Sequence, residues 1–487
     1  MKPNVILIVV DQMRAEALAL NEATHFASTP TLDSMAASGV NFQNMYSATP
    51  TCVPARASLL TGLDADRTGR VGYQDRVPWD YSQTLPQAFR DRGYQTECVG
   101  KMHVYPPRAR LGYDHVLLHD GYLHVQRKYG QAYGSQFENG DDYLAFLKGT
   151  LGTEADLTDD GIGCNSWEAR PWPYAERLHP TNWVVSESIK FLQRRDPTVP
   201  FFLKMSFEKP HAPLDPPAYY FDMYMDRLPA KLDLHLGDWA IPGSGVPDIE
   251  AMRGTLKDDD ERRMVAAYLG LVTQIDHQLS RFMTALGEFD ALGDTLIWFV
   301  SDHGDQLGEH RLFRKGYPYQ GSIHVPSFLY NAGGLLAGAR HTVPELVLLQ
   351  DIFPSLVDLA CGDAVAGVDG RSVKPLLFGE KTAWRQTFHG EHALGADSSQ
   401  FIVGPRWKLI WFPVRNVFQL FDRDTDPNEM CDRSRDPAAQ TIFVDYRAQL
   451  VAALTGREEG FVQDGQLVQV PVEAIRAVLG HRGGQTG

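Results

Sequence analysis

The sequence has no long apolar run and no cluster of positive charge. No segment of the 487 residues approaches the ~20 apolar residues of a membrane-spanning helix. The first apolar run, Val5–Val10, is too short for the core of a signal peptide and leads directly into Asp11-Gln12. We therefore expect no membrane partner and a cytoplasmic location. The formal net charge is −15, so nucleic acid is not expected to bind, whereas a small anionic substrate fits if positive charge is concentrated in one pocket.

Cysteine is scarce, and no two cysteines show a metal-binding spacing. The five cysteines are odd in number and none belongs to a C-x-x-C pair; they are Cys52, Cys98, Cys164, Cys361 and Cys431. This pattern indicates neither a disulfide framework nor a zinc ribbon. Internal repeats and low-complexity tracts are absent as well. Hydrophobic residues at 43% and charged residues at 22% are ordinary for a globular protein, and the length suffices for a large buried core.

Short apolar runs alternate with helical patterns through the first three quarters of the chain. Four runs rich in branched or aromatic residues predict buried strands: Val5–Val10, Gln95–Gly100, Phe201–Ser206 and Thr295–Ser301. Between them, Thr29-Pro30 predicts the start of a helix that Gly39 ends, and longer helical patterns cover Trp183–Arg195 and Arg262–Phe289. This alternation predicts an α/β fold whose large, mostly parallel mixed sheet is covered by helices on both faces.

The pattern changes near Gly370, where shorter strands begin. These strands are predicted at Gln400–Val403, Trp407–Phe412 and Val417–Phe421, followed by a helix over Ala438–Leu454. We therefore predict a catalytic α/β domain over residues 1–375 and a smaller α+β subdomain over residues 376–487. A short helical pattern at Val472–Leu479 and a glycine-rich end predict a tail that is either frayed or docked on a neighbouring subunit, which would form a homo-oligomer.

Polar motifs follow each of the four predicted strands of the larger domain. They are Asp11-Gln12, Lys101-Met102-His103, Pro210-His211-Ala212-Pro213 and Asp302-His303-Gly304-Asp305. In open α/β sheets, ligands bind beyond the carboxyl ends of the strands. We therefore expect the four motifs to contribute to one site.

Two of these motifs carry residues that suit a divalent cation: Asp11, Gln12, Asp302 and His303. Carboxylate and amide oxygens favour Ca²⁺, whereas the histidine nitrogen favours Mn²⁺ or another transition metal. For Asp11 alone, the alternative is the N-cap of the next helix. A cap explains Asp302-His303-Gly304 less well, because these turn-type residues precede a continuing polar loop.

The other motifs carry groups that neutralise charge and exchange protons. Lys101 and His103 lie two residues apart and would point to the same side of an extended segment; a surface lysine beside a partly buried histidine is the alternative. Lys315 belongs to a second cationic loop, Arg311–Tyr317, from which we expect one cation to enter the site and the others to be solvated. His211 is held between prolines, as suits a side chain aimed across a pocket. Its alternative is a loop histidine bonded to backbone.

Cys52, in the segment Cys52-Val53-Pro54-Ala55-Arg56, precedes a predicted helical stretch, Ala55–Leu60. A helix N-terminus lowers the pKa of a thiol and favours bound anions. Cys52 is therefore a candidate nucleophile, and Arg56, about one helical turn further on, could hold a charged adduct. An unmodified catalytic cysteine and an inert buried cysteine are the alternatives.

Taken together, these residues resemble the type I sulfatases of the alkaline-phosphatase superfamily over essentially the whole chain. The matching elements are Asp11, the C-x-P-x-R signal Cys52–Arg56 with Leu60-Thr61-Gly62, Gly100–His103, Pro210-His211, and Ser301–Gly304 with Lys315. The resemblance implies that a formylglycine-generating enzyme oxidises Cys52 to formylglycine. It also implies one divalent metal at Asp11, Cys52, Asp302 and His303, most readily Ca²⁺, with Mn²⁺ or Mg²⁺ as alternatives.

Two residues depart from the common sulfatase pattern. Gln12 stands where many sulfatases carry a second aspartate, and His303 stands where calcium-type arylsulfatases often carry asparagine. Both departures resemble the phosphonate monoester hydrolase and choline-sulfatase branches. They leave the identity of the metal open.

The resemblance further implies hydrolysis of sulfate monoesters, of the arylsulfatase type. Lys101, Lys315 and Arg56 would neutralise the ester together with the metal. His211 would protonate the departing alcohol, and His103 would take a proton from the second hydroxyl of the hydrated formylglycine, which a serine would lack. The main alternative is a phosphonate monoester or phosphodiester hydrolase. Lys101 and His103 favour sulfate, because that branch typically carries hydroxyl-bearing residues there; a degenerate anion-binding module is the non-enzymatic alternative.

We expect an aryl or carbohydrate sulfate as the substrate, with a choline-like sulfate as a further alternative, and two segments are candidates to contact it. The aromatic-rich insert Cys164–Trp183 could form the floor of a pocket for a ring, or it could be a packed structural loop. His389–His392 could reach the rim of the pocket, or it could simply end a strand.

Overall fold

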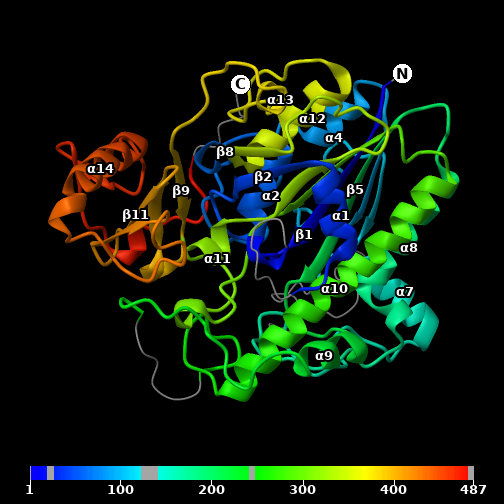
Figure 1. Ribbon diagram of the computed structural model, residues 1–487, viewed down its shortest axis with the longest axis horizontal. Helices are drawn as coiled ribbons and strands as arrows, with labels where there is room; N and C mark the ends of the chain where they lie inside the picture. Colours follow the sequence, from blue (N-terminus) through cyan, green and yellow to red (C-terminus); the bar gives the residue numbers. More distant parts are fainter. Residues whose placement is uncertain (1, 19–26, 122–140, 241–246, 481–487) are drawn as a thin grey trace.

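A computed structural model describes residues 2–18, 27–121, 141–240 and 247–480 of the protein. A central sheet has the strand order β4-β3-β5-β1-β6-β7-β2-β8 (Figure 1). Its strands are β1 (Asn4–Asp11), β2 (Val40–Tyr46), β3 (Gln95–Gly100), β4 (His115–Leu118), β5 (Phe201–Pro210), β6 (Thr295–Ser301), β7 (Ser327–Tyr330) and β8 (Thr342–Leu348). β7 runs antiparallel to β6 and β2, and the other neighbouring pairs are parallel. The predicted mostly parallel mixed sheet is confirmed.

Both faces of the central sheet are buried under helices, as the continuous apolar runs predict. Along β1, Ile6, Ile8 and Val10 join one apolar core, and Val5, Leu7 and Val9 join the other. The first face is covered by α1 (Pro30–Ser38), α7 (Asp142–Leu151), α8 (Pro180–Arg194), α9 (Ala218–Met225) and α10 (Asp258–Glu288). The second is covered by α2 (Cys52–Thr61), α4 (Leu85–Arg90), α12 (Ile352–Cys361) and α13 (Lys374–Leu377). Figure 1 shows the two helical layers on either side of the strands.

Short helices connect these layers: α3 (Ala65–Thr68) and α11 (Gln320–Ile323), with 3-10 turns η1 (Ala15–Ala17), η2 (Glu176–Leu178), η3 (Glu309–Arg311), η4 (Leu349–Asp351) and η5 (Gly395–Asp397). Within the described ranges, no helix combines the length and apolar character needed to cross a bilayer.

The four strands predicted from the sequence are β1, β3, β5 and β6, and β5 extends further than predicted, to Pro210. The predicted helix after Thr29 is α1, but its cap differs from the expectation. The Thr29 side chain makes no capping bond. Instead, the backbone N–H groups of Thr31 and Leu32 donate to the carboxylate of Asp276 in α10, at 3.2 and 2.7 Å. The start of the helix is therefore held by a tertiary contact that local sequence does not reveal.

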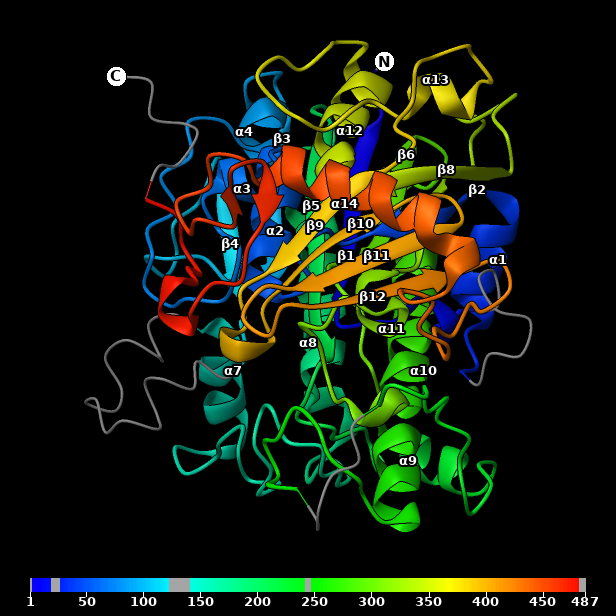
Figure 2. The ribbon, with the colours of Figure 1, turned by 90° about the vertical axis from the view of Figure 1, so that its left-hand side faces the viewer.

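A separate antiparallel sheet lies beyond residue 387, in the order β12-β11-β10-β9. Its strands are β9 (Phe388–His392), β10 (Ser399–Val403), β11 (Trp407–Phe412) and β12 (Val417–Asp422), and α14 (Gln440–Leu454) follows the turn η6 (Pro437–Ala439). Apolar residues of α14, including Leu450 and Leu454, pack on β10 and β11 (Figure 2). The smaller C-terminal subdomain is thus confirmed, whereas its boundary at residues 375/376 stays a prediction.

The end of the described chain is ordered against the same chain. After β13 (Val462–Gln463) and β14 (Gln466–Leu467), only Val472–Ala474 (η7) is helical. The predicted helix over Val472–Leu479 is therefore wrong. The reason is that residues after Ala474 are extended and pair with Gly69–Gly72, where Leu479 N donates to Gly69 O at 2.9 Å. Residues 477–479 pair with their own chain, and the predicted homo-oligomer stays a prediction. The glycine-rich residues 483–487 lie outside the described ranges.

Candidate functional site

The four strands that carry the polar motifs are immediate neighbours, in the order β3-β5-β1-β6. All three pairings among them are parallel, so their carboxyl ends share one edge of the sheet. β1 ends at Asp11, β3 leads into Lys101, β5 leads into His211, and β6 leads into Asp302. This topology brings the predicted motifs together, as expected for a site at the carboxyl edge.

Asp11, Cys52, Asp302 and His303 converge to form a fully buried cluster. One ligand atom from each residue lies within 4.8 Å of the others. His303 Nε2 lies 3.2 Å from Cys52 Sγ and 3.5 Å from Asp11 Oδ1. The other ring nitrogen, Nδ1, lies 3.0 Å from the carbonyl oxygen of Gly304 and must donate to it. Nε2 is therefore left unprotonated and directed at the cluster in the neutral ring, as a metal ligand requires.

The pKa values of the two carboxylates in the cluster are shifted in opposite directions. Burial raises the pKa of Asp11, but Lys101, His211 and Arg56 outweigh burial and lower it below its ordinary value. Burial and the nearby charge of Asp11 raise the pKa of Asp302. Two buried acids at one point repel each other unless positive charge separates them. The cluster therefore has the donor set and the charge of a divalent-cation site.

Arg56 lies beneath this cluster and does not line the pocket. Its guanidinium donates to Asp302 Oδ2 at 2.8 Å and to Asp11 Oδ2 at 3.3 Å. The remaining nitrogen donates to Ser206 Oγ and to the carbonyl oxygen of Lys101, at 2.8 and 3.0 Å. All these partners are protein groups, and Arg56 is 1% exposed. Arg56 is therefore positioned to orient the carboxylates, and its expected contact with a charged adduct stays a prediction.

Cys52 is the first residue of α2, and cations surround its sulfur. Lys315 Nζ lies 3.3 Å from Cys52 Sγ, and Lys101 Nζ lies 2.7 Å from Asp11 Oδ2. Burial raises the pKa of the Cys52 thiol, but Lys315, Lys101 and His303 outweigh burial and lower it well below its ordinary value. These surroundings favour the thiolate, unlike those of an inert core cysteine, and the role of Cys52 as a nucleophile stays a prediction.

Gln12 connects the metal-type cluster to Lys315. Its Oε1 accepts from Lys315 Nζ at 2.8 Å, and its Nε2 donates to Asp305 Oδ2 at 2.6 Å. The backbone of Gln12 is left-handed, with φ 73°, and its N–H donates to Asp302 Oδ1 at 3.2 Å. Its amide therefore positions Lys315, and its role as a metal ligand stays a prediction.

Lys101 and His103 both line the pocket, but not through an extended segment. His103 has a left-handed backbone, φ 59°, because Asp120 Oδ1 accepts from the N–H groups of both Met102 and His103, at 2.7 and 2.9 Å. The resulting tight turn places His103 in the same pocket as Cys52, where it helps to lower the pKa of the Cys52 thiol. Asp120 had no signal in the sequence, because its role depends on this tertiary contact.

His211 lies in the pocket with a fixed tautomer. Its Nδ1 donates to the carbonyl oxygen of Ala212 at 2.6 Å, which leaves Nε2 as the nitrogen free of that bond in the pocket that Cys52 also lines. Burial and the charge of Lys315 lower the pKa of His211 to about 3. The ring is therefore neutral in the ligand-free site.

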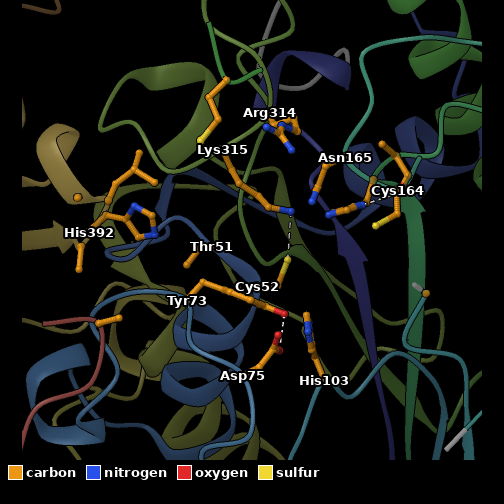
Figure 3. Close-up of a pocket in the computed structure, with 18 of the residues that line it drawn as sticks. Thr51, Cys52, Tyr73, Asp75, His103, Cys164, Asn165, Arg314, Lys315 and His392 are labelled. Atoms are coloured by element: carbon orange, nitrogen blue, oxygen red, sulfur yellow. Dashed lines mark hydrogen bonds between the residues drawn. The ribbon is translucent and has the colours of Figure 1, made fainter. Parts of the chain in front are cut away.

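These residues open into a pocket of about 570 Å³. Figure 3 shows Lys315 and Tyr73 reaching toward Cys52 from opposite sides, with His103, Cys164, Asn165, Arg314 and His392 around them. Arg314 lines the pocket although it was expected to be solvated. Tyr73, Asp75 and Glu208 also line it without having been singled out by any motif.

The two substrate segments proposed from the sequence contribute only in part. Cys164 and Asn165 line the pocket, but Trp167 and Trp172 of the same insert are packed in the core. The insert is thus mainly a packed structural loop. At the end of β9, His392 lines the pocket, whereas His389 bonds Gln400 Oε1 at 2.8 Å and does not line it.

Comparison with known proteins gives consistent matches over the whole chain. Residues 3–362 match the Sulfatase family, and residues 308–455 match the family described as N-sulphoglucosamine sulphohydrolase, C-terminal. An arylsulfatase of Clostridium perfringens is 47% identical over 485 residues, which cover 98% of this chain and 100% of the relative.

Solved structures share the fold over nearly the full length. A phosphonate monoester hydrolase from Silicibacter pomeroyi superposes with a TM-score of 0.72 at 24% identity, covering 93% of this chain and 95% of the other. A protein solved in complex with its substrate D-glucosamine-2-N,6-O-disulfate has a TM-score of 0.72 at 19% identity, covering 93% and 98%. The chain therefore belongs to the sulfatase family of the alkaline phosphatase superfamily and is a sulfuric ester hydrolase.

Proposed function

We propose that the protein hydrolyses aryl sulfate monoesters through a formylglycine made from Cys52, with one divalent metal ion beside it. The observation that carries the proposal is the position of Cys52 Sγ, 3.2 Å from His303 Nε2, 3.6 Å from Asp11 Oδ1 and 3.3 Å from Lys315 Nζ. A nucleophile at this point would lie between metal ligands on one side and a cation on the other. This arrangement suits attack on an anionic ester.

The residues present fit a divalent cation. Asp11 and Asp302 supply hard oxygen ligands, His303 presents Nε2, and the oxygen of formylglycine would complete the set. We propose Ca²⁺ as the ion, with Mn²⁺, which the histidine ligand favours, and Mg²⁺ as alternatives. When bound, such an ion would offset charge on the ester and lower the pKa of the attacking hydroxyl. Arg56 would hold the two carboxylates in place for it.

A hydrated formylglycine would supply two hydroxyls on one carbon, one to displace the alcohol from sulfur and one whose deprotonation expels sulfate. Lys101 and Lys315 would hold the ester oxygens. His103, which lines the same pocket as residue 52, would accept the proton of the second hydroxyl. The proposed maturation also requires a formylglycine-generating enzyme as a transient partner.

His211 is the proposed acid for the departing alcohol. It lines the same pocket as Cys52, and its Nδ1–H is fixed on Ala212 O. Burial and Lys315 lower the pKa of His211 to about 3, so the ligand-free ring carries no spare proton. An anionic ester bound at Lys315 would offset that charge and favour proton uptake, so that the proton arrives with the substrate.

Phosphonate monoester hydrolysis is the second candidate, and Gln12 and His303 are the residues that favour it. Lys101 and His103 favour sulfate, because both side chains line the pocket. The arylsulfatase relative supports an aryl leaving group. A carbohydrate sulfate is the alternative leaving group, as in the structural relative whose substrate is a sulfated sugar.

The test combines chemistry and kinetics on one preparation. Protein co-produced with a formylglycine-generating enzyme should yield a Cys52 peptide of formylglycine mass. It should hydrolyse 4-nitrophenyl sulfate with a higher kcat/KM than phenyl phenylphosphonate, and chelation of divalent metal should remove the activity. An unmodified thiol at Cys52 with retained activity would overturn the mechanism. A higher kcat/KM for phenyl phenylphosphonate than for 4-nitrophenyl sulfate would favour a phosphonate monoester hydrolase.

A further inference from the structure

The C-terminal tail, defined as residues 472–479, forms part of the pocket that contains Cys52. Val472, Ile475 and Ala477 line it together with Cys52, Lys101 and Lys315. The tail is 420 or more residues after Cys52 in the chain, yet it closes the site in the same molecule.

Backbone hydrogen bonds fix the tail in place. The N–H groups of Val71 and Gly72 both donate to Ala477 O at 3.0 Å, and Leu479 is buried against Ala65 and Val71. On its other side, Gly72 pairs with Ala393 at the end of β9. A side chain at Gly72 would lie 2.8 Å from the Cβ of Ala393 and 3.1 Å from the Cα of Ala477. Three distant segments therefore meet at a glycine that allows their close approach.

This junction lies next to the catalytic groups. Tyr73 directly follows Gly72, and its ring makes an edge contact with the imidazole of His103 at a centroid distance of 5.7 Å. His103 and Cys52 line the same pocket. The tail lines this pocket as well, together with His211, the proposed acid for the departing alcohol.

The tail presents apolar side chains to the pocket and keeps its charges away from it. Glu473 and Arg476 are exposed and do not line the pocket. Val472 is 41% exposed in the absence of a ligand, and Leu394 and Met252 line the same pocket. An apolar wall of this kind gains free energy by covering an aromatic ring, whereas a sugar would leave its hydroxyls without partners there.

We infer that Val472 and Ile475 are specificity-determining residues that bind the apolar leaving group of the ester. This inference rests on the proposed function and names the part of the chain that selects its substrate. Charge at Lys101 and Lys315 would hold the sulfate, and the tail would hold the ring. Neither tail residue takes part in the chemistry.

Binding of non-hydrolysable sulfonates to the full-length protein tests the inference without turnover. Calorimetry should show that 1-naphthalenesulfonate binds more tightly than methanesulfonate. Val472→Ser and Ile475→Ser should each lower the affinity for 1-naphthalenesulfonate by about fivefold. Neither variant should change the affinity for methanesulfonate. Val417→Ser is the matched control, because Val417 is similarly exposed at 46%, lies in the same subdomain and is remote from the pocket; it should change neither value.

The outcomes separate this inference from the proposed function. Equal affinity of the wild-type protein for both sulfonates, or an unchanged ratio in both tail variants, would overturn the role of the tail even if 4-nitrophenyl sulfate is hydrolysed. Failure of the fully modified wild-type protein to hydrolyse 4-nitrophenyl sulfate would instead refute the proposed function. Thermal unfolding checks each fold, and Val472→Ser should unfold close to wild type because the side chain is partly exposed.

Discussion

The floor of the pocket, formed by the cluster Asp11, Cys52, Asp302 and His303 with Arg56, differs from its rim, formed by Tyr73, Leu394 and the C-terminal tail. Floor residues are fully buried, charged and bonded to one another through several contacts each. Rim residues are apolar or aromatic and in part exposed. The floor comes from the ends of β1 and β6 and from the first turns of α2, whereas the rim joins segments far apart in the chain. The difference indicates that one part is built for chemistry and the other for fitting a leaving group.

The largest expected effect is at Cys52. Cys52→Ala removes the nucleophile precursor, so kcat for aryl sulfate should fall by roughly 10⁴-fold or more, because no neighbouring group can replace it. Steady-state kinetics on protein made with the modifying enzyme measure this loss. Cys431→Ala, at an exposed cysteine outside the site, is the control and should retain full activity.

A change beneath the floor should act through the metal. Arg56→Met leaves the carboxylates of Asp11 and Asp302 without their buried partner, which should lower metal affinity about 10- to 100-fold and stability by about 3–5 kcal/mol. Metal titration and thermal unfolding measure the two effects. Arg70→Met removes an equally buried guanidinium that bonds Val77 O and Pro78 O. It should destabilise the fold but keep the metal affinity of the folded protein, and equal loss of affinity in both variants would argue against a specific role of Arg56.

The cations around Cys52 can be tested by the pH dependence of alkylation. The thiolate is the reactive form, and Lys315 helps to lower the thiol pKa. In unmodified, metal-free protein, iodoacetamide should therefore label Cys52 at a lower pH than an ordinary thiol. Lys315→Met should raise the pKa and move the labelling profile to higher pH, whereas the exposed Lys381→Met should not. An unmoved profile in Lys315→Met would contradict the proposed charge arrangement.

The smallest effect on chemistry is expected at the junction of the rim. Gly72→Ala introduces a methyl group too close to Ala393 and Ala477, which should destabilise the protein by about 1–3 kcal/mol and loosen the tail. We expect faster hydrogen exchange over residues 472–479 and a raised KM for aryl sulfates, with kcat nearly unchanged. Gly287→Ala, in α10 with nothing near the added methyl group, is the control. A lower kcat with an unaltered KM in Gly72→Ala would contradict this prediction, because it would show that the junction affects the catalytic step and not substrate binding.

Much of the floor could be predicted from the sequence, because each motif follows an apolar run at short range. Asp11, Lys101, His211 and Asp302 directly follow or closely trail their strands, and parallel strands bring such ends to one edge. The exceptions are instructive. His103 is turned into the pocket by Asp120, and Arg56 is drawn away from the substrate side by two carboxylates; neither contact is local.

The rim could not be predicted in the same way. The helical pattern at Val472–Leu479 competes with backbone pairing to Gly69–Gly72, and the pairing prevails beyond Ala474. Its partners are about 400 residues away, so no short-range pattern encodes them. His392 and Leu394 likewise line the pocket only because the smaller sheet lies beside the larger one.

The sequence by itself determined the strand–helix alternation, the strand-end motifs and the Cys52 signal, because these depend on periodicity and on residues close together in the chain. Only the tertiary structure decided which groups face the substrate, which cations position the carboxylates, and that the tail completes the pocket. Those outcomes follow from burial and from hydrogen-bond donors being shared among distant segments. An unpaired buried charge is strongly destabilising, so each buried charge pairs with a group that the fold brings close, even when that group is distant in the sequence.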